Sequence, residues 1–261
     1  MKRDIKAVFF DIDGTLFLHD QQYIAPSSLD AIREMHANGI KLVVCTGRNR
    51  AEYNILPEAI RDLPFDACIT AAGGCVDMKE RIVQARTFSL PDVLKIIDVA
   101  MEHKVELYFM DDQKTGLIQK PSALVKEAIM AYHGDVPPVC EMRPFSVHHF
   151  IAFCTPEQDE LLRNELHQIE YHRSSERTVD LYPLGTNKQA GIEVVLREWN
   201  LDRSQIMAFG DSFNDVEMLR YAGVGVAMGN GSTLAKEAAD YICEPIEQDG
   251  IYLTCKQFGL I

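Results

Sequence analysis

The chain has 261 residues, of which 47% are hydrophobic, and a formal net charge of −13 at pH 7. Its length and hydrophobic content allow one large or two modest globular domains and argue against intrinsic disorder. The negative charge argues against nucleic acid or an anionic membrane as a partner, because both bind cationic surfaces. It leaves open a phosphorylated small molecule, since a metal ion and a few placed donors can reverse the field locally.

The first part of the chain alternates predicted strands and helices. Residues 6–11 form a strand buried on both faces, because the apolar residues run on rather than alternate. A helix is expected over 26–38, with a proline in its first turn and a glycine after its end. Further strands are expected at 40–45 and 67–70. This order predicts a parallel sheet with right-handed crossovers.

The last part of the chain returns to the same alternation. The predicted elements are, in order, a helix at 188–199, a strand at 205–210, a helix at 213–221, a strand at 224–227, a helix at 231–239 and a strand at 241–243. We therefore expect both ends of the chain to contribute to one sheet.

The middle of the chain has a different rhythm. Predicted helices at 91–103, 121–132 and 157–169 alternate with strands near 105–110, 148–154 and 178–182. The prediction is an α/β protein whose doubly wound parallel sheet is built from 1–83 and 184–261. A second α+β domain, residues 84–183, is inserted between these segments.

The N-terminus and the cysteines favour a cytoplasmic protein. The first apolar run spans only Ala7 to Phe10 and is followed by acids, unlike a signal peptide. No stretch approaches the roughly 20 apolar residues of a membrane helix. The seven cysteines are scattered without a C-x-x-C pair, so we expect reduced, mostly buried thiols. We expect a monomer or a weak oligomer.

The first polar motif, Asp11-Ile12-Asp13-Gly14-Thr15, comes directly after the first predicted strand. Ligands of open parallel sheets bind outside the carboxyl ends of the strands. Two aspartates followed by a glycine suit a hard cation and a tight turn. The same string also occurs in calcium loops and ordinary turns, so this motif alone does not decide between them.

The second polar motif, Thr46-Gly47-Arg48, also follows a buried strand. Thr46 offers a hydroxyl group, and Gly47 allows a backbone N–H to approach an anion near the start of a helix. Taken alone, the motif is better explained by a simple turn from strand to helix.

Two further polar segments lie in the last part of the chain. Lys188 follows Asn187, a good N-cap, and a lysine there opposes the helix dipole unless an anion is near. The segment Gly210-Asp211-Ser212-Phe213-Asn214-Asp215 follows a strand, and its serine also suits a helix cap. Together, the four segments supply what phosphoryl transfer needs: carboxylates for attack and metal binding, a hydroxyl donor, a fixed cation and an amide.

The order D-x-D-G-T, T-G-R, lysine and G-D-S-x-N-D resembles that of the haloacid dehalogenase superfamily of hydrolases. The insert resembles the α+β cap of its Cof-type branch, whose members are mostly phosphatases of sugar phosphates and related compounds. The resemblance covers the whole chain and is strongest to bacterial hexose-phosphate phosphatases. It implies a Rossmann-like core, an inserted cap that sets specificity, and hydrolysis of a small phosphate monoester through an aspartyl-phosphate.

The resemblance also implies roles for the acidic residues. Asp11 is expected to be the nucleophile and to bind Mg²⁺ through its side chain. Asp13 is expected to be the general acid/base and to bind Mg²⁺ through its backbone carbonyl. Asp211 would complete the metal site, and Asp215 would support it.

Phosphate contacts are implied for residues of the other motifs. Thr46, Gly47 and Asn214 would hold phosphate oxygens, and Lys188 would neutralise both the phosphate and the nucleophile. Two departures stand out: Ala72-Gly73-Gly74 replaces the frequent N-G-A, so we expect one polar contact near the substrate to be missing. Gln189 stands where glycine is common after the lysine.

Several alternatives stay open from the sequence. A phosphomutase, or a phosphatase for a nucleotide or cofactor phosphate, would carry the same motifs. A binding protein without activity is disfavoured, because a structural role would not require all four charged motif residues. Candidate specificity residues in 84–183 are Asp111, Arg143, His148 and Asp180, whereas His148-His149 is expected to be part of a strand rather than a metal site.

Overall fold

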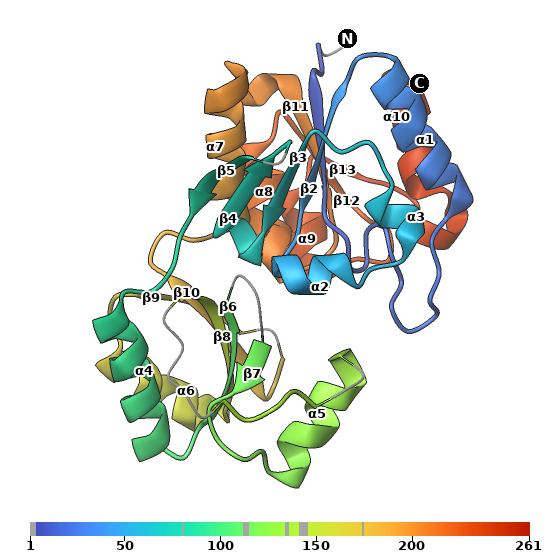
Figure 1. Cartoon of the computed structure of the whole chain (residues 1–261). Coiled ribbons are helices and arrows are strands. Elements are labelled where there is room, and N and C mark those ends of the chain that lie inside the picture. The colour runs from blue at the N-terminus through green and yellow to red at the C-terminus, as the bar shows by residue number, and fades with distance from the viewer. Residues whose placement is uncertain (1–3, 80, 112–114, 134–135, 141–145, 174) are drawn as a thin grey trace. The chain divides into compact units, whose positions relative to one another are not determined.

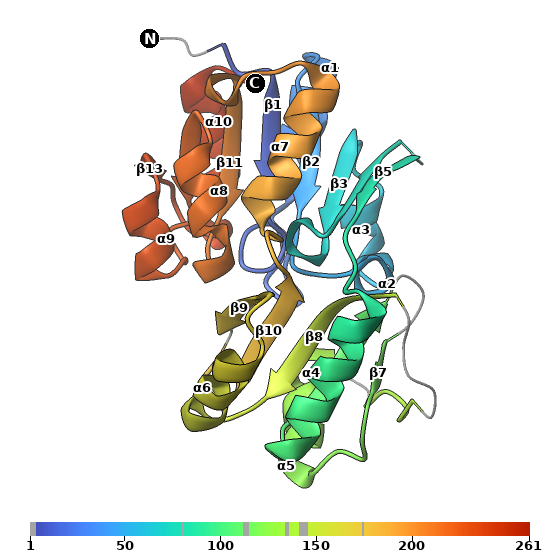
Figure 2. The same cartoon turned by 90° about the vertical axis from the view of Figure 1, so that its left-hand side faces the viewer.

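The computed structural model describes residues 4–79, 81–111, 115–133, 136–140, 146–173 and 175–261 (Figures 1 and 2). The chain divides into two compact units. The core unit comprises Met1–Arg48, Glu52–Ala85 and Asn187–Ile261. The inserted unit comprises Asn49–Ala51 and Arg86–Thr186. Within the described ranges, no helix combines the length and apolar character needed to span a lipid bilayer.

The core unit is built on a sheet of strand order β13-β12-β11-β1-β2-β3-β4-β5. The first six of these pair in parallel: β13 (Tyr241–Ile242), β12 (Val224–Ala227), β11 (Ile206–Gly210), β1 (Ala7–Phe10), β2 (Lys41–Cys45) and β3 (Ala67–Thr70). The predicted parallel sheet from both ends of the chain is therefore confirmed.

The edge hairpin β4 (Cys75–Met78) and β5 (Arg81–Ala85) was not predicted. It extends the sheet by antiparallel pairing, and β5 is largely exposed. Its sequence lacks the continuous apolar run that identified the buried strands, because an edge hairpin needs few apolar side chains.

Helices cover both faces of the core sheet (Figures 1 and 2). The helices of the core unit are α1 (Pro26–Ala37), α3 (Glu58–Arg61), α7 (Lys188–Trp199), α8 (Val216–Tyr221), α9 (Thr233–Ala238) and α10 (Gly250–Phe258). The short helix α2 (Arg50–Asn54) has residues in both units. Val8 and Phe10 of β1 pack with α1 and α10, whereas Ala7 and Phe9 pack with α7, α8 and α9. This arrangement confirms the doubly wound α/β class.

Two predicted details of the core helices differ from the structure. The predicted helix 213–221 is divided into a 3₁₀ turn at Phe213–Asp215 and α8, because Asp215 is held by hydrogen bonds to the preceding loop. No element was predicted after residue 243, where the structure has α10.

The inserted unit contains an antiparallel sheet of strand order β7-β6-β8-β10-β9. Its strands are β6 (Glu106–Asp111), β7 (Thr115–Leu117), β8 (Val147–Phe153), β9 (Ile169–Arg173) and β10 (Thr178–Pro183), and its helices are α4 (Leu90–Glu102), α5 (Ala123–His133) and α6 (Pro156–Glu165). Helices α4 and α6 share one hydrophobic cluster with the sheet, and α5 shares another.

The predicted helix 157–169 is wrong at its C-terminal end. Helix α6 ends at Glu165, and Ile169 belongs to β9, which was not predicted. The hydroxyl of Tyr171 in β9 donates to the carbonyls of Leu162 and Leu166. These contacts join the C-terminal end of α6 to β9.

Candidate active site

Three of the polar motifs meet at one edge of the core sheet. Asp11, Thr46 and Asp211 directly follow the last residues of β1, β2 and β11. Phe10, the last residue of β1, lies opposite the penultimate residue of each neighbouring strand. The carboxyl ends of the three strands are therefore level, which brings segments far apart in the sequence to one site.

Lys188 joins this site from the first turn of α7. Its Nζ donates to Asp11 Oδ1 and to Asp215 Oδ1, both at 2.6 Å. The side chains of Lys188 and Asp215 are fully buried, and that of Asp11 is 6% exposed. Asn187 caps the helix by accepting from Ala190 N at 2.8 Å, which fixes the position of the lysine backbone. Two carboxylates thus offset the unfavourable lysine at a helix N-terminus.

Burial and charge act in opposite directions in this cluster. Burial raises the pKa of Asp11 well above its ordinary value, Lys188 opposes the rise, and the neighbouring carboxylates add to it. Burial and then the charge of Asp215 raise the pKa of Asp211 to about 7. Burial lowers the pKa of Lys188, but Asp11 and Asp215 outweigh it, so the net shift is upward and the amine stays charged.

The acidic residues fit a divalent cation with oxygen ligands. Carboxylate oxygens of Asp11, Asp211 and Asp215 lie within 4.8 Å of one another. A Cβ atom at Gly14 would lie 2.2 Å from Asp211 Oδ2, so glycine leaves the space that the carboxylate fills. The hydroxyl of Thr15 donates to the other oxygen, Asp211 Oδ1, at 3.2 Å. A set of hard oxygen donors favours magnesium or calcium over zinc.

Asp215 also organises the loop that carries Asp211. Its Oδ2 accepts from Asp211 N at 3.0 Å and from Ser212 N at 2.9 Å, while its Oδ1 accepts from Lys188. Both of its oxygens therefore have donors within the protein.

The three predicted phosphate-binding groups other than Lys188 also come together. Thr46 is buried, and its Oγ1 accepts from Arg48 N at 3.1 Å, which leaves the hydroxyl proton for another acceptor. Ser212 Oγ donates to Asn214 Oδ1 at 2.7 Å and so orients the amide. Asn214 Nδ2 lies 3.4 Å from where a Cβ of Gly47 would stand. A hydroxyl, a glycine backbone and an amide nitrogen thus lie close together.

Asp13 has a partner that was not predicted from the sequence. Arg48 Nε donates to Asp13 Oδ2, and Arg48 Nη2 donates to Asp13 Oδ1, each at 2.7 Å. We assigned no role to Arg48, although its place directly after Thr46-Gly47 was a usable signal. The side chains are 17% exposed for the arginine and 43% exposed for the aspartate.

The 3₁₀ turn Ala71–Gly73 after β3 supports the site through its backbone. Ala71 N donates to Arg48 O at 2.7 Å, and Ala72 N donates to Thr46 O at 3.0 Å. A Cβ at Gly73 would lie 2.0 Å from the carbonyl oxygen of Asn187, so this turn approaches the start of α7 closely. The side chain of Ala72 is buried and has no polar group, so it cannot supply the contact expected from an asparagine there.

The specificity candidates Asp111, His148 and Asp180 lie on strands of the inserted unit. His148 Nδ1 lies 2.7 Å from Arg86 O, and His149 Nε2 lies 3.0 Å from Asp180 Oδ1. Both histidines belong to β8, as expected, and Asp111 ends β6. Arg143 lies outside the described residues.

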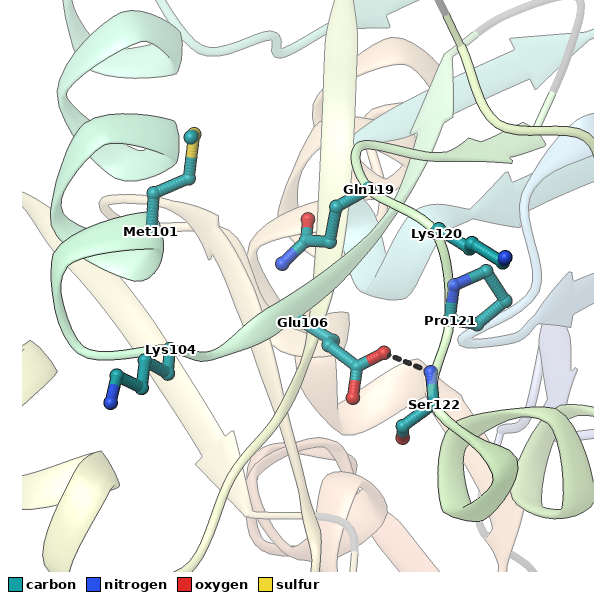
Figure 3. Close-up of a pocket in the computed structure, with 7 residues that line it drawn as sticks. All are labelled: Met101, Lys104, Glu106, Gln119, Lys120, Pro121 and Ser122. Atoms are coloured by element: carbon teal, nitrogen blue, oxygen red, sulfur yellow. Dashed lines mark hydrogen bonds between the residues drawn. The ribbon is translucent and has the colours of Figure 1, made fainter.

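A hollow in the inserted unit, shown in Figure 3, is separate from these motifs. Its volume is about 470 Å³, and its lining is Met101, Lys104, Glu106, Gln119, Lys120, Pro121 and Ser122. Glu106 accepts from Ser122 N at 2.5 Å, which already satisfies the amide just before α5. None of the predicted site residues belongs to this lining.

The chain is similar to known hydrolases. A family model for haloacid dehalogenase-like hydrolases matches residues 8–254. The 5-amino-6-(5-phospho-D-ribitylamino)uracil phosphatase of Bacillus subtilis is 29% identical over 256 residues, which cover 95% of this chain and 93% of that protein.

Two solved structures match both units of the chain. A sugar phosphatase of haloacid dehalogenase subclass IIB has a TM-score of 0.86 at 30% identity, covering 98% of this chain and 100% of that one. A phosphatase from Bacteroides thetaiotaomicron has a TM-score of 0.90 at 26% identity, covering 98% of this chain and 96% of that one.

Proposed function

The chain belongs to the haloacid dehalogenase-like hydrolases, and we propose that it is a magnesium-dependent phosphatase that hydrolyses small phosphate monoesters through Asp11. The observation that carries this proposal is the buried contact of Lys188 with Asp11 and Asp215. A carboxylate can attack a dianionic phosphate only where fixed positive charge removes the repulsion between them. A lysine buried between two carboxylates at the carboxyl ends of parallel strands supplies that charge.

In the first step, an oxygen of the Asp11 carboxylate attacks the phosphorus atom. The bond between phosphorus and the ester oxygen breaks, and that oxygen takes a proton from the carboxylic acid of Asp13. The products are a neutral alcohol, the aspartyl-phosphate on Asp11 and the carboxylate of Asp13. Charge is conserved, since the proton moves with the bond that breaks.

In the second step, a water molecule attacks the phosphorus atom of the aspartyl-phosphate. Its proton passes to the carboxylate of Asp13, and the bond between phosphorus and Asp11 breaks. Inorganic phosphate leaves, Asp11 returns to its carboxylate form, and Asp13 is again an acid. One water molecule is consumed for each ester bond broken.

The remaining motif residues would bind the phosphoryl group and the metal. Thr46, Gly47 and Asn214 offer a hydroxyl, a backbone N–H and an amide N–H to its oxygens, and Lys188 offers its charge. The carboxylates of Asp11 and Asp211 and the backbone carbonyl of Asp13 would hold Mg²⁺, with Asp215 fixing the loop of Asp211. When bound, the ion supplies positive charge that polarises the phosphoryl oxygens.

For the substrate, we propose sugar phosphates, with hexose phosphates first. The 30% identical solved structure is described as a sugar phosphatase, which supports this class. The Bacillus subtilis relative is named for a phosphate on a ribitylamino-uracil, which supports the alternative of a phosphorylated metabolite other than a hexose phosphate. A phosphomutase is the other alternative. Measuring released inorganic phosphate separates hydrolysis from transfer to a second position of the same sugar.

The phosphate-binding groups are common to all phosphate esters, so we propose that the inserted unit acts as a cap and sets the leaving-group preference. Exchanging residues 84–183 for those of a relative should change the substrate profile and leave magnesium dependence unchanged. If the exchanged protein keeps the substrate profile of the protein that supplied residues 1–83 and 184–261, this assignment is wrong. The seven free cysteines support a reducing compartment, for which we propose the cytoplasm.

The test of the phosphatase proposal is a comparison of wild type and Asp11→Asn. The amide is nearly isosteric but a poor nucleophile, so turnover of a hexose phosphate should fall by several powers of ten while thermal unfolding stays cooperative. Chelation should abolish wild-type activity, and magnesium rather than calcium should restore it, because calcium prefers longer bonds and more ligands. A variant within about tenfold of wild type would overturn the covalent mechanism.

A further inference from the structure

The contact between Arg48 and Asp13 is bidentate. Both oxygens of the carboxylate accept from one edge of the guanidinium, at 2.7 Å each, across 35 residues of sequence. A bidentate pair of this kind fixes the plane and direction of the carboxylate as well as its distance. A lysine at this position would supply charge without that constraint.

The arginine end of the pair is anchored by the protein. Arg48 N donates to Thr46 Oγ1, and Arg48 O accepts from Ala71 N at 2.7 Å. Burial disfavours the charged guanidinium, but the hydrogen bonds to Asp13 outweigh it and raise the pKa of Arg48, so the side chain is charged. The aspartate is the more exposed partner, with 43% of its side chain accessible against 17% for the arginine.

Without this partner, Asp13 would face other carboxylates. The charge of Asp13 is among the causes that raise the pKa of both Asp11 and Asp211, so the three acids repel one another when ionised. The positive charge of Arg48 next to Asp13 offsets this repulsion, as that of Lys188 does next to Asp11. The site thus has two fixed cations, one for each of the two aspartates in the first motif.

We propose that Arg48 is a positioning residue that serves the leaving group through Asp13 and does not bind the phosphate. This inference rests on the proposed phosphatase activity. The two donors on one edge of Arg48 are both committed to Asp13. The donors proposed for the phosphate are Thr46, Gly47 and Asn214, with Lys188 as the fixed charge. When Asp13 carries a proton on one oxygen, the other oxygen still accepts from Arg48. The arginine therefore keeps the acid oriented in both steps of the reaction.

The leaving group separates this role from phosphate binding. An alkoxide from a sugar phosphate needs a proton from Asp13 as the ester bond breaks, whereas the nitrophenolate of p-nitrophenyl phosphate leaves without one. We expect Arg48→Ala to lower kcat/KM for a hexose phosphate by about a hundredfold, within the usual contribution of a general acid. For p-nitrophenyl phosphate, kcat/KM should stay within about threefold of wild type.

Three further variants complete the test. Arg48→Lys keeps the charge but not the bidentate bond, so it should restore only part of the loss and only for the hexose phosphate. In an Asp13→Asn background, Arg48→Ala should cause no further loss on the hexose phosphate, because both changes remove one function. Arg33→Ala breaks a surface arginine–aspartate pair with Asp30 in α1 and should change neither substrate.

Each remaining outcome counts against a specific claim. Equal loss on both substrates, persisting in the Asp13→Asn background, would show that Arg48 binds phosphate and would overturn the inference. Wild-type rates for both arginine variants would also overturn it. If Arg48→Ala fails to unfold cooperatively, the test rests on Arg48→Lys alone. Its loss of kcat/KM on the hexose phosphate is then compared with its loss on p-nitrophenyl phosphate. Wild-type protein that hydrolyses neither ester would overturn the proposed function itself.

Discussion

The site contains two contacts between carboxylates and a cation that have similar distances but very different surroundings. Lys188 lies 2.6 Å from Asp11 and from Asp215, and all three side chains are at least 94% buried. Arg48 lies 2.7 Å from Asp13, whose side chain is 43% exposed. The first contact is almost entirely shielded from solvent in this structure, whereas the aspartate of the second is partly exposed. Burial therefore suits Lys188 to a fixed charge and suits Asp13 to a group that exchanges protons.

The two contacts also differ in what the fold must do to make them. Asp11 and Lys188 are 177 residues apart, so this contact depends on the pairing of strands from both ends of the chain and on the start of α7. Asp13 and Arg48 come from adjacent strand ends of the same unit. A change in the first contact should therefore affect folding as well as chemistry, and a change in the second should affect mainly chemistry.

The largest effect that would test this contrast is expected from Lys188→Met. The substitution leaves two buried carboxylates without their cation, and breaking a buried ion pair in this way costs about 3–5 kcal/mol. We expect a large fall in the midpoint of urea unfolding and loss of activity. Lys79→Met is the matched control, because Lys79 pairs with Asp66 at 3.3 Å but is 75% exposed. That change should cost less than about 1 kcal/mol.

Equal destabilisation by the two lysine variants would contradict the expected difference between a buried and an exposed ion pair, since burial would then have no effect on stability. A stable but inactive Lys188→Met would separate the two roles of the lysine and assign it to catalysis alone.

A smaller effect is expected in the pH dependence of the metal-free protein. The pKa of Asp211 is raised on folding from an ordinary 3.8 to about 7. A raised carboxyl pKa stabilises the fold in acid, and this contribution is lost as pH rises through the folded-state value. The melting temperature in chelator should therefore fall between about pH 4 and pH 7, more steeply in wild type than in Asp211→Asn.

Magnesium should reverse this trend at pH 8, because an ion bound only by the folded state stabilises it by mass action. Parallel pH profiles for wild type and Asp211→Asn in chelator would show that burial of this carboxyl does not govern the slope. A profile unaffected by magnesium would argue against a metal at this site.

What could be predicted from the sequence follows the same division between buried and exposed structure. Strands β1, β2 and β11 were predicted because their apolar residues are continuous, as required of strands covered on both faces. Strands β4, β5, β7 and β9 lack such runs and were missed. The site residues Asp11, Lys188 and Asp211 were placed by the order of their motifs, which the resemblance to a family supplied.

The pairing of Arg48 with Asp13 could not be predicted in that way. An arginine can contact any of several nearby carboxylates. The choice depends on side-chain torsions and on how far the two strands extend, and local sequence determines neither. The backbone conformation of Ala72 could not be predicted from local sequence either. Alanine disfavours the left-handed region, so the fold imposes this conformation.

The smallest effect concerns the turn Ala71–Gly73, which touches both halves of the site. It donates to the carbonyls of Thr46 and Arg48 on one side and approaches Asn187, next to Lys188, on the other. Ala72 has φ 50° and ψ 37°, a left-handed conformation that costs a non-glycine residue about 1–2 kcal/mol. Glycine would remove this cost but lose about 0.5–1 kcal/mol through the greater freedom of the unfolded chain.

We therefore expect Ala72→Gly to stabilise the protein by up to about 1 kcal/mol, seen as a rise of a few degrees in melting temperature. Ala128→Gly is the control, because it places glycine inside helix α5 and should destabilise by about 1 kcal/mol. A fall in stability for Ala72→Gly would mean that packing of the buried Ala72 methyl outweighs the backbone strain. The turn would then hold the two cations in place by side-chain packing as well as by its hydrogen bonds, and kcat for the hexose phosphate should fall together with stability.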